Sequence, residues 1–274
     1  MMDALTLLKG WPSLRNAGAE SLLASPAWRL TSRKGSSAVT LTQAETLPDD
    51  ALVLAVTLDD EPCRLALVDS PAFPDLHRLW SHLRDLPEAL VLALVEKECG
   101  ALFTQVEALT RRLFVLKGLA GSREGLRPFS VRGEDFAFDF GLELLPTLAA
   151  TLGRLENLDP SHPSVRALTR PVRATYGLLL VSDEELAALK PGDFVLLPEN
   201  FGATAKWETR EALDANEALA VAAAEESELS FAAFADGDFP PLPEPAELEL
   251  TRNGKLLFRA TRTQVGCAAA LKIL

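Results

Sequence analysis

Residues 172–197 read VRATYGLLLVSDEELAALKPGDFVLL. The apolar and β-branched residues at the start predict a strand over 173–181. Ser182 and Glu185 match a capping box, in which each side chain bonds the other residue's backbone N–H at the start of a helix. A Pro-Gly-Asp turn ends this short helix, and a further strand is predicted over 194–197. The segment therefore predicts strand, capped helix, tight turn and strand in succession.

A hairpin is predicted near the C-terminus, where Asn-Gly at 253–254 separates two apolar runs. Asn-Gly favours a type I′ turn because both central residues of that turn need positive φ. Pairing about this turn places Leu250 opposite Leu257 on one face and Glu249 opposite Phe258 on the other. Because both faces then carry apolar groups, we expect both to be covered.

Three further runs of the C-terminal third can be extended, residues 203–209, 218–224 and 228–234. The alanines of the middle run suit a helix equally well. Residues 236–245 contain four prolines and predict an extended, stiff linker. The C-terminal third is therefore predicted to be rich in strands.

The N-terminal half predicts short strands after a short initial helix. One hairpin joins residues 28–33 to 38–42 across a Lys-Gly-Ser-Ser turn, and a second pair of strands covers 52–58 and 64–68. The alternation of β-branched and apolar residues in these runs is typical of half-buried strands.

The apolar spacing then becomes helical. A helix is predicted over 76–86, and Pro87 begins a longer one that continues to Leu113. Glycines punctuate a basic connector over 118–125. Residues 129–144 return to strand-like alternation, and residues 146–156 predict a short amphipathic helix.

The fold class is predicted to be α+β with two domains. The segment 157–164 contains two prolines and is the predicted boundary. Residues 1–158 form a mixed domain of short strands and two to three helices. Residues 165–274 form a small β-rich domain that includes the acidic insertion described next and the proline-rich linker.

Charge is distributed unevenly over the chain. The formal net charge is −12. Residues 211–251 carry eleven acidic and no basic side chains, whereas residues 111–132 carry six basic residues and one acidic residue. The acidic field disfavours nucleic acid and anionic lipid as partners. Each run is interpreted either as a solvated face or as a docking surface for an oppositely charged partner.

Composition indicates a cytosolic protein. The 274 residues are 48% hydrophobic, enough to form a core. No uninterrupted apolar run exceeds the seven residues of 89–95, which is far shorter than the roughly 18 residues that a membrane span needs. The N-terminus lacks the pattern of a secretory signal, and the three cysteines are dispersed and are expected to be reduced.

The sequence shows no pattern of catalytic chemistry. It contains no nucleophile elbow, phosphate-binding loop or dinucleotide fingerprint. His77 and His82 are five residues apart on a predicted helix and do not share a face as metal ligands would, and His162 lies between prolines. We therefore expect no enzyme activity, and no catalytic, metal or cofactor-binding residues. An alternative is a hydrolase that uses His77 or His82 with a carboxylate.

Residues 172–197 resemble the opening of a SpoA (surface-presentation-of-antigens) domain. In that family a strand leads into a helix of the form S-x-x-E-L-x-x-L-x-P-G-D, followed by a strand V-L-x-L, and Leu186, Leu189 and residues 191–193 stand at the matching places. Residues 86–113 resemble the helix that precedes the middle strands in type III secretion cytoplasmic-ring (sorting-platform) proteins of the YscQ/HrcQ kind. These proteins are related to flagellar motor switch proteins.

The chain departs from the longer family members, which carry two SpoA units, because only one Pro-Gly-Asp helix is present. The resemblance implies that the unit pairs with another SpoA-containing protein, which is either a second copy or a separate small subunit. The residues expected at this interface are apolar or aromatic, and the acidic segment 225–238 is expected to steer or shield a partner site. The expected interface residues are Tyr176, Leu178, Leu180, Leu186, Leu189, Phe194, Leu196, Leu257 and Phe258.

The resemblance also implies a function. It is that of a non-catalytic scaffold in the cytoplasm, peripheral to the inner-membrane base of a type III secretion apparatus and without membrane insertion of its own. The implied partners are the stator of the export ATPase and chaperone–cargo complexes. A flagellar motor switch component is the alternative within this class, although the N-terminal peptide and middle domain expected of one are not found.

Overall fold

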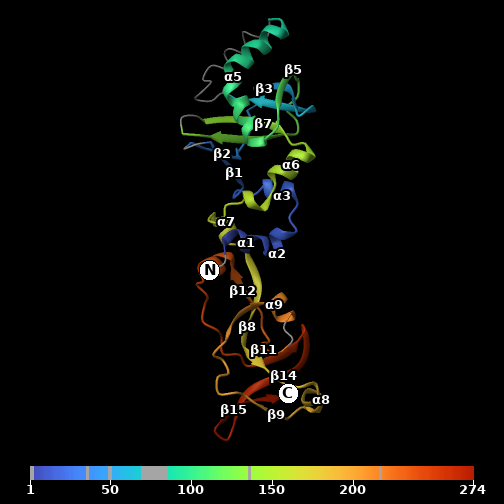
Figure 1. The fold of residues 1–274 in the computed structure, drawn as a ribbon, viewed down its shortest axis with the longest axis vertical. Coiled ribbons are helices and arrows are strands. Elements are labelled where there is room, and N and C mark those ends of the chain that lie inside the picture. The colour runs from blue at the N-terminus through green and yellow to red at the C-terminus, as the bar shows by residue number, and fades with distance from the viewer. Residues whose placement is uncertain (1–2, 35–36, 49–50, 69–85, 135–136, 216–217) are drawn as a thin grey trace. The chain divides into compact units, whose positions relative to one another are not determined.

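The computed structural model describes residues 3–34, 37–48, 51–68, 86–134, 137–215 and 218–274 (Figure 1). The chain divides into two compact units, one of residues 8–165 and one of residues 1–7 with 166–274. Each unit combines helices with one antiparallel sheet, so the fold class is α+β. The helix predicted over 76–86 lies outside the described residues.

The unit of residues 8–165 contains one seven-stranded sheet with the order β1-β2-β6-β7-β4-β3-β5. The strands are β1 (Arg29–Lys34), β2 (Ser37–Gln43), β3 (Leu52–Leu58), β4 (Glu61–Leu67), β5 (Phe114–Leu119), β6 (Leu126–Arg132) and β7 (Ala137–Glu143). The helical segments at this end of the chain are α1 (Ala4–Lys9), α2 (Pro12–Arg15), α3 (Ala19–Leu23), α5 (Glu88–Thr110), α6 (Pro146–Leu152), η1 (Leu155–Asn157) and α7 (Pro163–Arg166).

Helix α5 spans 23 residues, and one side of it is buried. Phe103 of α5 stacks on Phe114 of β5 with 4.6 Å between ring centroids, which fixes the helix to the edge of the sheet. Both predicted strand pairs of the N-terminal half, β1–β2 and β3–β4, are confirmed. The buried Phe138 and Phe140 also confirm the alternation predicted around them.

Two predictions in this unit are wrong. The long helix ends at Thr110 rather than Leu113, because Arg111 adopts the left-handed conformation that terminates helices. Residues 114–119 form the strand β5, which pairs with β3, so a strand directly follows the predicted helix and replaces the beginning of the predicted connector. The segment 129–144 forms parts of two strands, β6 and β7, that pair with each other.

The C-terminal unit contains the second sheet, with the order β10-β8-β11-β13-β14-β15-β9 and with β12 paired to β8. Its strands are β8 (Thr169–Leu179), β9 (Phe194–Leu196), β10 (Lys206–Thr209), β11 (Leu219–Ala223), β12 (Ser227–Ser230), β13 (Leu248–Arg252), β14 (Lys255–Val265) and β15 (Ala268–Ile273). Its helices are α8 (Asp183–Ala188), α9 (Arg210–Asp214) and α10 (Phe231–Asp236).

The local structure of residues 172–197 is confirmed. Strand β8 is followed by α8, whose N-cap Ser182 accepts a hydrogen bond from the Glu185 N–H while the Glu185 carboxylate accepts one from the Ser182 N–H. The ambiguous alanine-rich run is the strand β11, and all five of its residues are buried. Ala220 and Ala222 pack with Leu213 of α9, whereas Leu219, Val221 and Ala223 belong to the main core of the unit.

The turn at Asn253 and Gly254 is confirmed, since both residues have positive φ and β13 pairs with β14 around them. The predicted register is wrong. Leu250 pairs with Phe258 and Glu249 pairs with Arg259, because the register shifts between Leu250 and Thr251 and leaves Leu257 as an extra residue. Of the run 228–234, predicted as extended, residues 228–230 belong to β12, whereas residues 231–234 belong to α10. Within the described part of the chain, no helix is both long and apolar enough to cross a bilayer.

Candidate interaction surface

The short strand β9 forms one end of the C-terminal sheet and pairs only with β15 among the described residues. Val195 points inward and packs against the core cluster of the unit. Phe194 and Leu196, which alternate with Val195, are 50% and 61% exposed. The strand therefore presents two large apolar side chains on its outer face.

The backbone of β9 also has a free edge. Within the ladder to β15, Leu197 N–H donates to Ala269 C=O and Ile273 N–H donates to Asp193 C=O, both at 2.9 Å. Hydrogen-bonding direction alternates along a strand, so the backbone groups of Phe194 and Leu196 point away from β15. Unpaired N–H and C=O groups beside exposed apolar side chains form a template for another strand.

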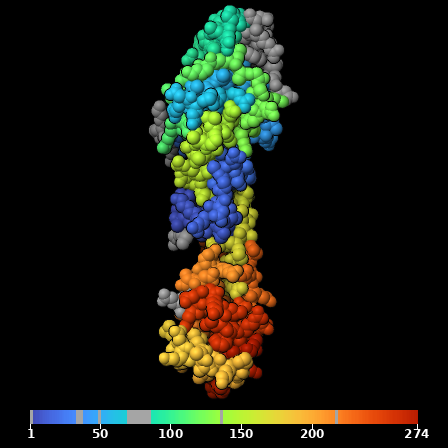
Figure 2. Space-filling model, turned by 90° about the vertical axis from the view of Figure 1, so that its right-hand side faces the viewer, coloured from blue at the N-terminus to red at the C-terminus, as the bar shows by residue number. Residues whose placement is uncertain are grey.

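The same outer face continues over two more strands. Antiparallel register places Lys272 beside Phe194 and the fully buried Ala270 beside Leu196, and it places Val265 of β14 beside Ala268 of β15. Val265 is 41% exposed and Ala268 is also exposed. In Figure 2 the segment around α8 and β9, in yellow, lies at the surface beside the red C-terminal strands. We call the side chains of Phe194, Leu196, Val265 and Ala268 the β9 surface.

The structure separates the nine predicted interface residues into three groups. Four are exposed, two are buried and three are half-buried against the core, so only part of the predicted set lies on a free surface. The exposed residues are Leu178, Leu180, Phe194 and Leu196; the buried ones are Tyr176 and Leu186; the half-buried ones are Leu189, Leu257 and Phe258.

Sequence reasoning missed Val265 and Ala268 because it did not predict β15. The available signal was the apolar content of the last seven residues, but alanine favours strands so weakly that the signal was not decisive. Both faces of β13 are covered, as expected, but by residues of the same chain. Leu250 is fully buried on one face, and on the other face Glu249 is only 8% exposed.

The two charge runs are partly neutralised within their own units. Of the basic run, Arg112 pairs with Glu61 at 2.8 Å, Arg127 with Glu20 at 3.9 Å and Arg132 with Asp139 at 3.6 Å. Of the acidic run, four carboxylates pair with arginines that lie near the start of β8. These pairs are Asp236–Arg166, Glu211–Arg170, Glu226–Arg173 and Glu249–Arg173. Such pairing favours the solvated-face interpretation for these residues.

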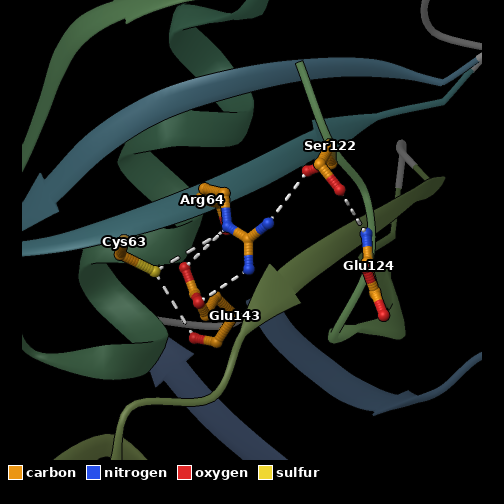
Figure 3. A network of polar contacts seen from close by, with 5 residues as sticks. All are labelled: Cys63, Arg64, Ser122, Glu124 and Glu143. Atoms are coloured by element: carbon orange, nitrogen blue, oxygen red, sulfur yellow. Dashed lines mark hydrogen bonds and ion pairs between the residues drawn. The ribbon is translucent and has the colours of Figure 1, made fainter. Parts of the chain in front are cut away.

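The polar network around Arg64 connects three parts of the N-terminal sheet (Figure 3). The guanidinium donates to both carboxylate oxygens of Glu143, at 3.0 and 2.8 Å, and to the backbone oxygen of Ser122 at 3.1 Å. The hydrogen bonds from Arg64 lower the pKa of the Glu143 carboxyl. Cys63 donates to the backbone oxygen of Glu143 at 3.4 Å, and burial raises the pKa of its thiol to about 11. This network ties β4, β7 and the β5–β6 loop together, and its groups are engaged with one another.

Of the three histidines, the structure describes one. The N–H of Ser164 donates to His162 Nδ1 at 3.2 Å, which places the ring at the start of α7. His77 and His82 lie outside the described residues. Among the residues that are described, no group of three or more histidine, cysteine, aspartate or glutamate side chains could hold a metal ion.

No family model matches the sequence, and no curated protein matches it.

Proposed function

We propose that the protein is a non-catalytic scaffold of a type III secretion apparatus, in the cytoplasmic ring, and that it pairs through the β9 surface. The observation that carries the proposal is the edge of β9 that faces away from β15, where the backbone groups of the exposed Phe194 and Leu196 have no strand partner within the described part of the chain. The SpoA-like segment 172–197 supports it, because β9 is the strand that follows the Pro-Gly-Asp turn of that segment.

The chemistry of the surface fits a polypeptide partner. A strand added at this edge would satisfy the outward backbone groups of Phe194 and Leu196, and its side chains on the same face would pack beside theirs. The only charged residue among the β9 and β15 positions on this face is Lys272. Burial of the surface would therefore require little desolvation of charge. We propose a second copy of the chain as the partner, with a separate small SpoA subunit as the alternative.

The wider role follows from the resemblance. A ring scaffold holds the stator of the export ATPase and receives chaperone–cargo complexes, and we propose both as partners of the assembled protein. The paired surface would lie in the C-terminal unit and leave the N-terminal sheet and α5 for other contacts.

The test replaces Phe194 and Leu196 together by aspartate. Both side chains are at least half exposed, so the variant is expected to keep the wild-type circular dichroism spectrum and melting temperature. Light scattering after size exclusion should show loss of self-association, because two carboxylates would enter the interface. Capture of the stator of the export ATPase, which mass spectrometry would identify, should fall with it.

Leu113→Asp is the matched control, since Leu113 is 63% exposed and belongs to the other unit. It should leave self-association unchanged. A wild-type monomer that binds a separate SpoA subunit through the same two residues would assign the alternative partner. A double variant that associates and captures the stator as the wild type does would refute the proposal. Leu257 and Phe258 are unsuitable for this test because they pack against the core.

A further inference from the structure

A proline-rich segment, residues 238–246, crosses the C-terminal unit between α10 and β13; we call it the strap. Four of its nine residues are proline and have no N–H to donate. Among the described residues the strap makes no backbone–backbone hydrogen bond, and the next such bond is from Ala224 N–H to Glu247 C=O. The strap is therefore not part of the sheet that it crosses.

Two aromatic side chains hold the strap by its carbonyl groups. The indole Nε1–H of Trp207 donates to the Pro240 carbonyl at 2.8 Å, and the hydroxyl of Tyr176 donates to the Pro243 carbonyl at 2.6 Å. Polyproline II has three residues per turn, so carbonyls three residues apart face the same side. The two donors therefore match the repeat of an extended proline-rich chain.

An apolar anchor lies between the two bonded carbonyls. Leu242 packs against the core cluster that includes Tyr176, and Trp207 packs against the same cluster. Trp207 comes from β10 and Tyr176 from β8, which are neighbouring strands. This arrangement, with aromatic donors on paired strands and one apolar contact between them, is the way in which globular domains bind proline-rich peptides in an aromatic groove.

The strap does not fill the space beside it. A cavity of about 600 Å³ is lined both by residues of the strands, including Trp207 and Ala174, and by Pro243 and Pro245 of the strap. The side chain of Phe239, at the start of the strap, is 42% exposed. The ring of Phe239 also packs edge-on against Phe234 of α10, with 5.3 Å between centroids. The side chains that donate hydrogen bonds to the strap are held by the strands β8 and β10.

We propose that Tyr176 and Trp207 form a groove that binds proline-rich extended segments of a partner protein, and that the strap occupies this groove as an internal competitor. The strap shows the chemistry of the ligand: two carbonyl acceptors three residues apart, with an aliphatic side chain between them. Because the strap is tethered, its effective concentration is high, and a partner segment binds only in the fraction of molecules in which the strap has left. The inference is independent of pairing through β9.

The test uses a fluorescein-labelled peptide with the strap sequence, GDFPPLPEPA, and fluorescence anisotropy. In one variant, residues 239–245 are replaced by glycine and serine at equal length. This variant should bind the peptide at least about tenfold more tightly than the wild type does, since the internal competitor is absent. In this background, Tyr176→Phe and Trp207→Phe should each weaken binding by about tenfold, because each removes one hydrogen bond to the peptide. Leu256→Ser, an exposed position in the same unit, should have no effect.

A milder variant protects the test against loss of folding. Leu242→Ser removes only the apolar anchor of the strap, and it should also strengthen peptide binding. If folded variants of both kinds bind the peptide no more tightly than the wild type does, or if binding is unaffected by Tyr176→Phe and Trp207→Phe, the proposal is refuted. A wild-type dimer that dissociates when the strap is replaced would show that the groove takes the strap of a second copy, which also overturns the assignment to a partner protein.

Discussion

Gly153 lies where α6 meets α3, and replacing it by alanine should destabilise the N-terminal unit. A Cβ atom built on Gly153 would lie 2.7 Å from the backbone Cα and carbonyl carbon of Ala19, and still closer to its carbonyl oxygen. Because these are backbone atoms at the start of α3, no side-chain rotation relieves the overlap. The two helices must separate instead.

The size of the effect follows from overpacking. Inserting a carbon into a well-packed contact costs about 1–3 kcal/mol, and the backbone contact places Gly153→Ala in the upper half of that range, about 2–3 kcal/mol. Gly100→Ala is the matched control within the same unit. Gly100 lies inside α5, and a Cβ there would meet no atom within 4 Å. Alanine in a helix is more stabilising than glycine by about 0.5–1 kcal/mol.

Differential scanning calorimetry of the full chain measures both changes. For a unit of this size, about 1 kcal/mol shifts the melting temperature by roughly 2–4 °C. Gly153→Ala should therefore lower one transition by roughly 4–12 °C, and Gly100→Ala should raise the same transition by roughly 1–4 °C. If Gly153→Ala leaves that transition unchanged or raises it, the close approach of α6 to α3 is refuted. If the two substitutions move different transitions, Gly100 and Gly153 do not belong to one cooperative unit.

Three further predictions concern single side chains. Iodoacetamide at pH 8 should label Cys267 first, because Cys267 is exposed. Burial raises the pKa of Cys63 to about 11 and that of Cys99 to about 12, so both should react slowly. Mass spectrometry that finds all three cysteines labelled at one rate would contradict this. Glu143→Gln should cost about 0.5–1 kcal/mol at pH 7. In the wild type the pKa of the Glu143 carboxyl lies below the ordinary 4.5, so its ion pair with Arg64 stabilises the fold above pH 4.5. Urea titrations should show that the difference in unfolding free energy between variant and wild type disappears as pH falls through the lower, folded-state pKa. Ser182→Ala should lower the stability of the C-terminal unit by about 1 kcal/mol in the same assay, and no change would mean that the capping box contributes nothing there.

Features set by neighbouring residues could be predicted from the sequence. The capping box at Ser182 and Glu185 and the turn at Asn253 and Gly254 depend on side chains and φ angles within a few residues, and both are confirmed. The long helix was predicted for the same reason, although its end was misplaced. Leu113 continued the apolar spacing of the helix, while the left-handed Arg111 gave no signal in the sequence.

Features set by distant partners could not be predicted. The run Leu219–Ala223 is a strand because it lies between β8 and β13, and its alanines alone do not distinguish strand from helix. The extra residue Leu257 in β14 changes which side chains face the core without altering the turn. The candidate surface was found only in part for the same reason, since Phe194 and Leu196 belong to a recognisable segment whereas Val265 joins them through the unpredicted β15.

The alanines of β11 have a consequence for how this protein can change over evolutionary time. Ala220 and Ala222 are fully buried between the sheet and Leu213 of α9, so that a larger residue would push the helix away and glycine would loosen the strand. Few substitutions should therefore be tolerated at these two positions, whereas loops and charged faces can change more freely. In a distant descendant with little overall identity, two small residues spaced by one in a buried strand should persist as a mark of common origin.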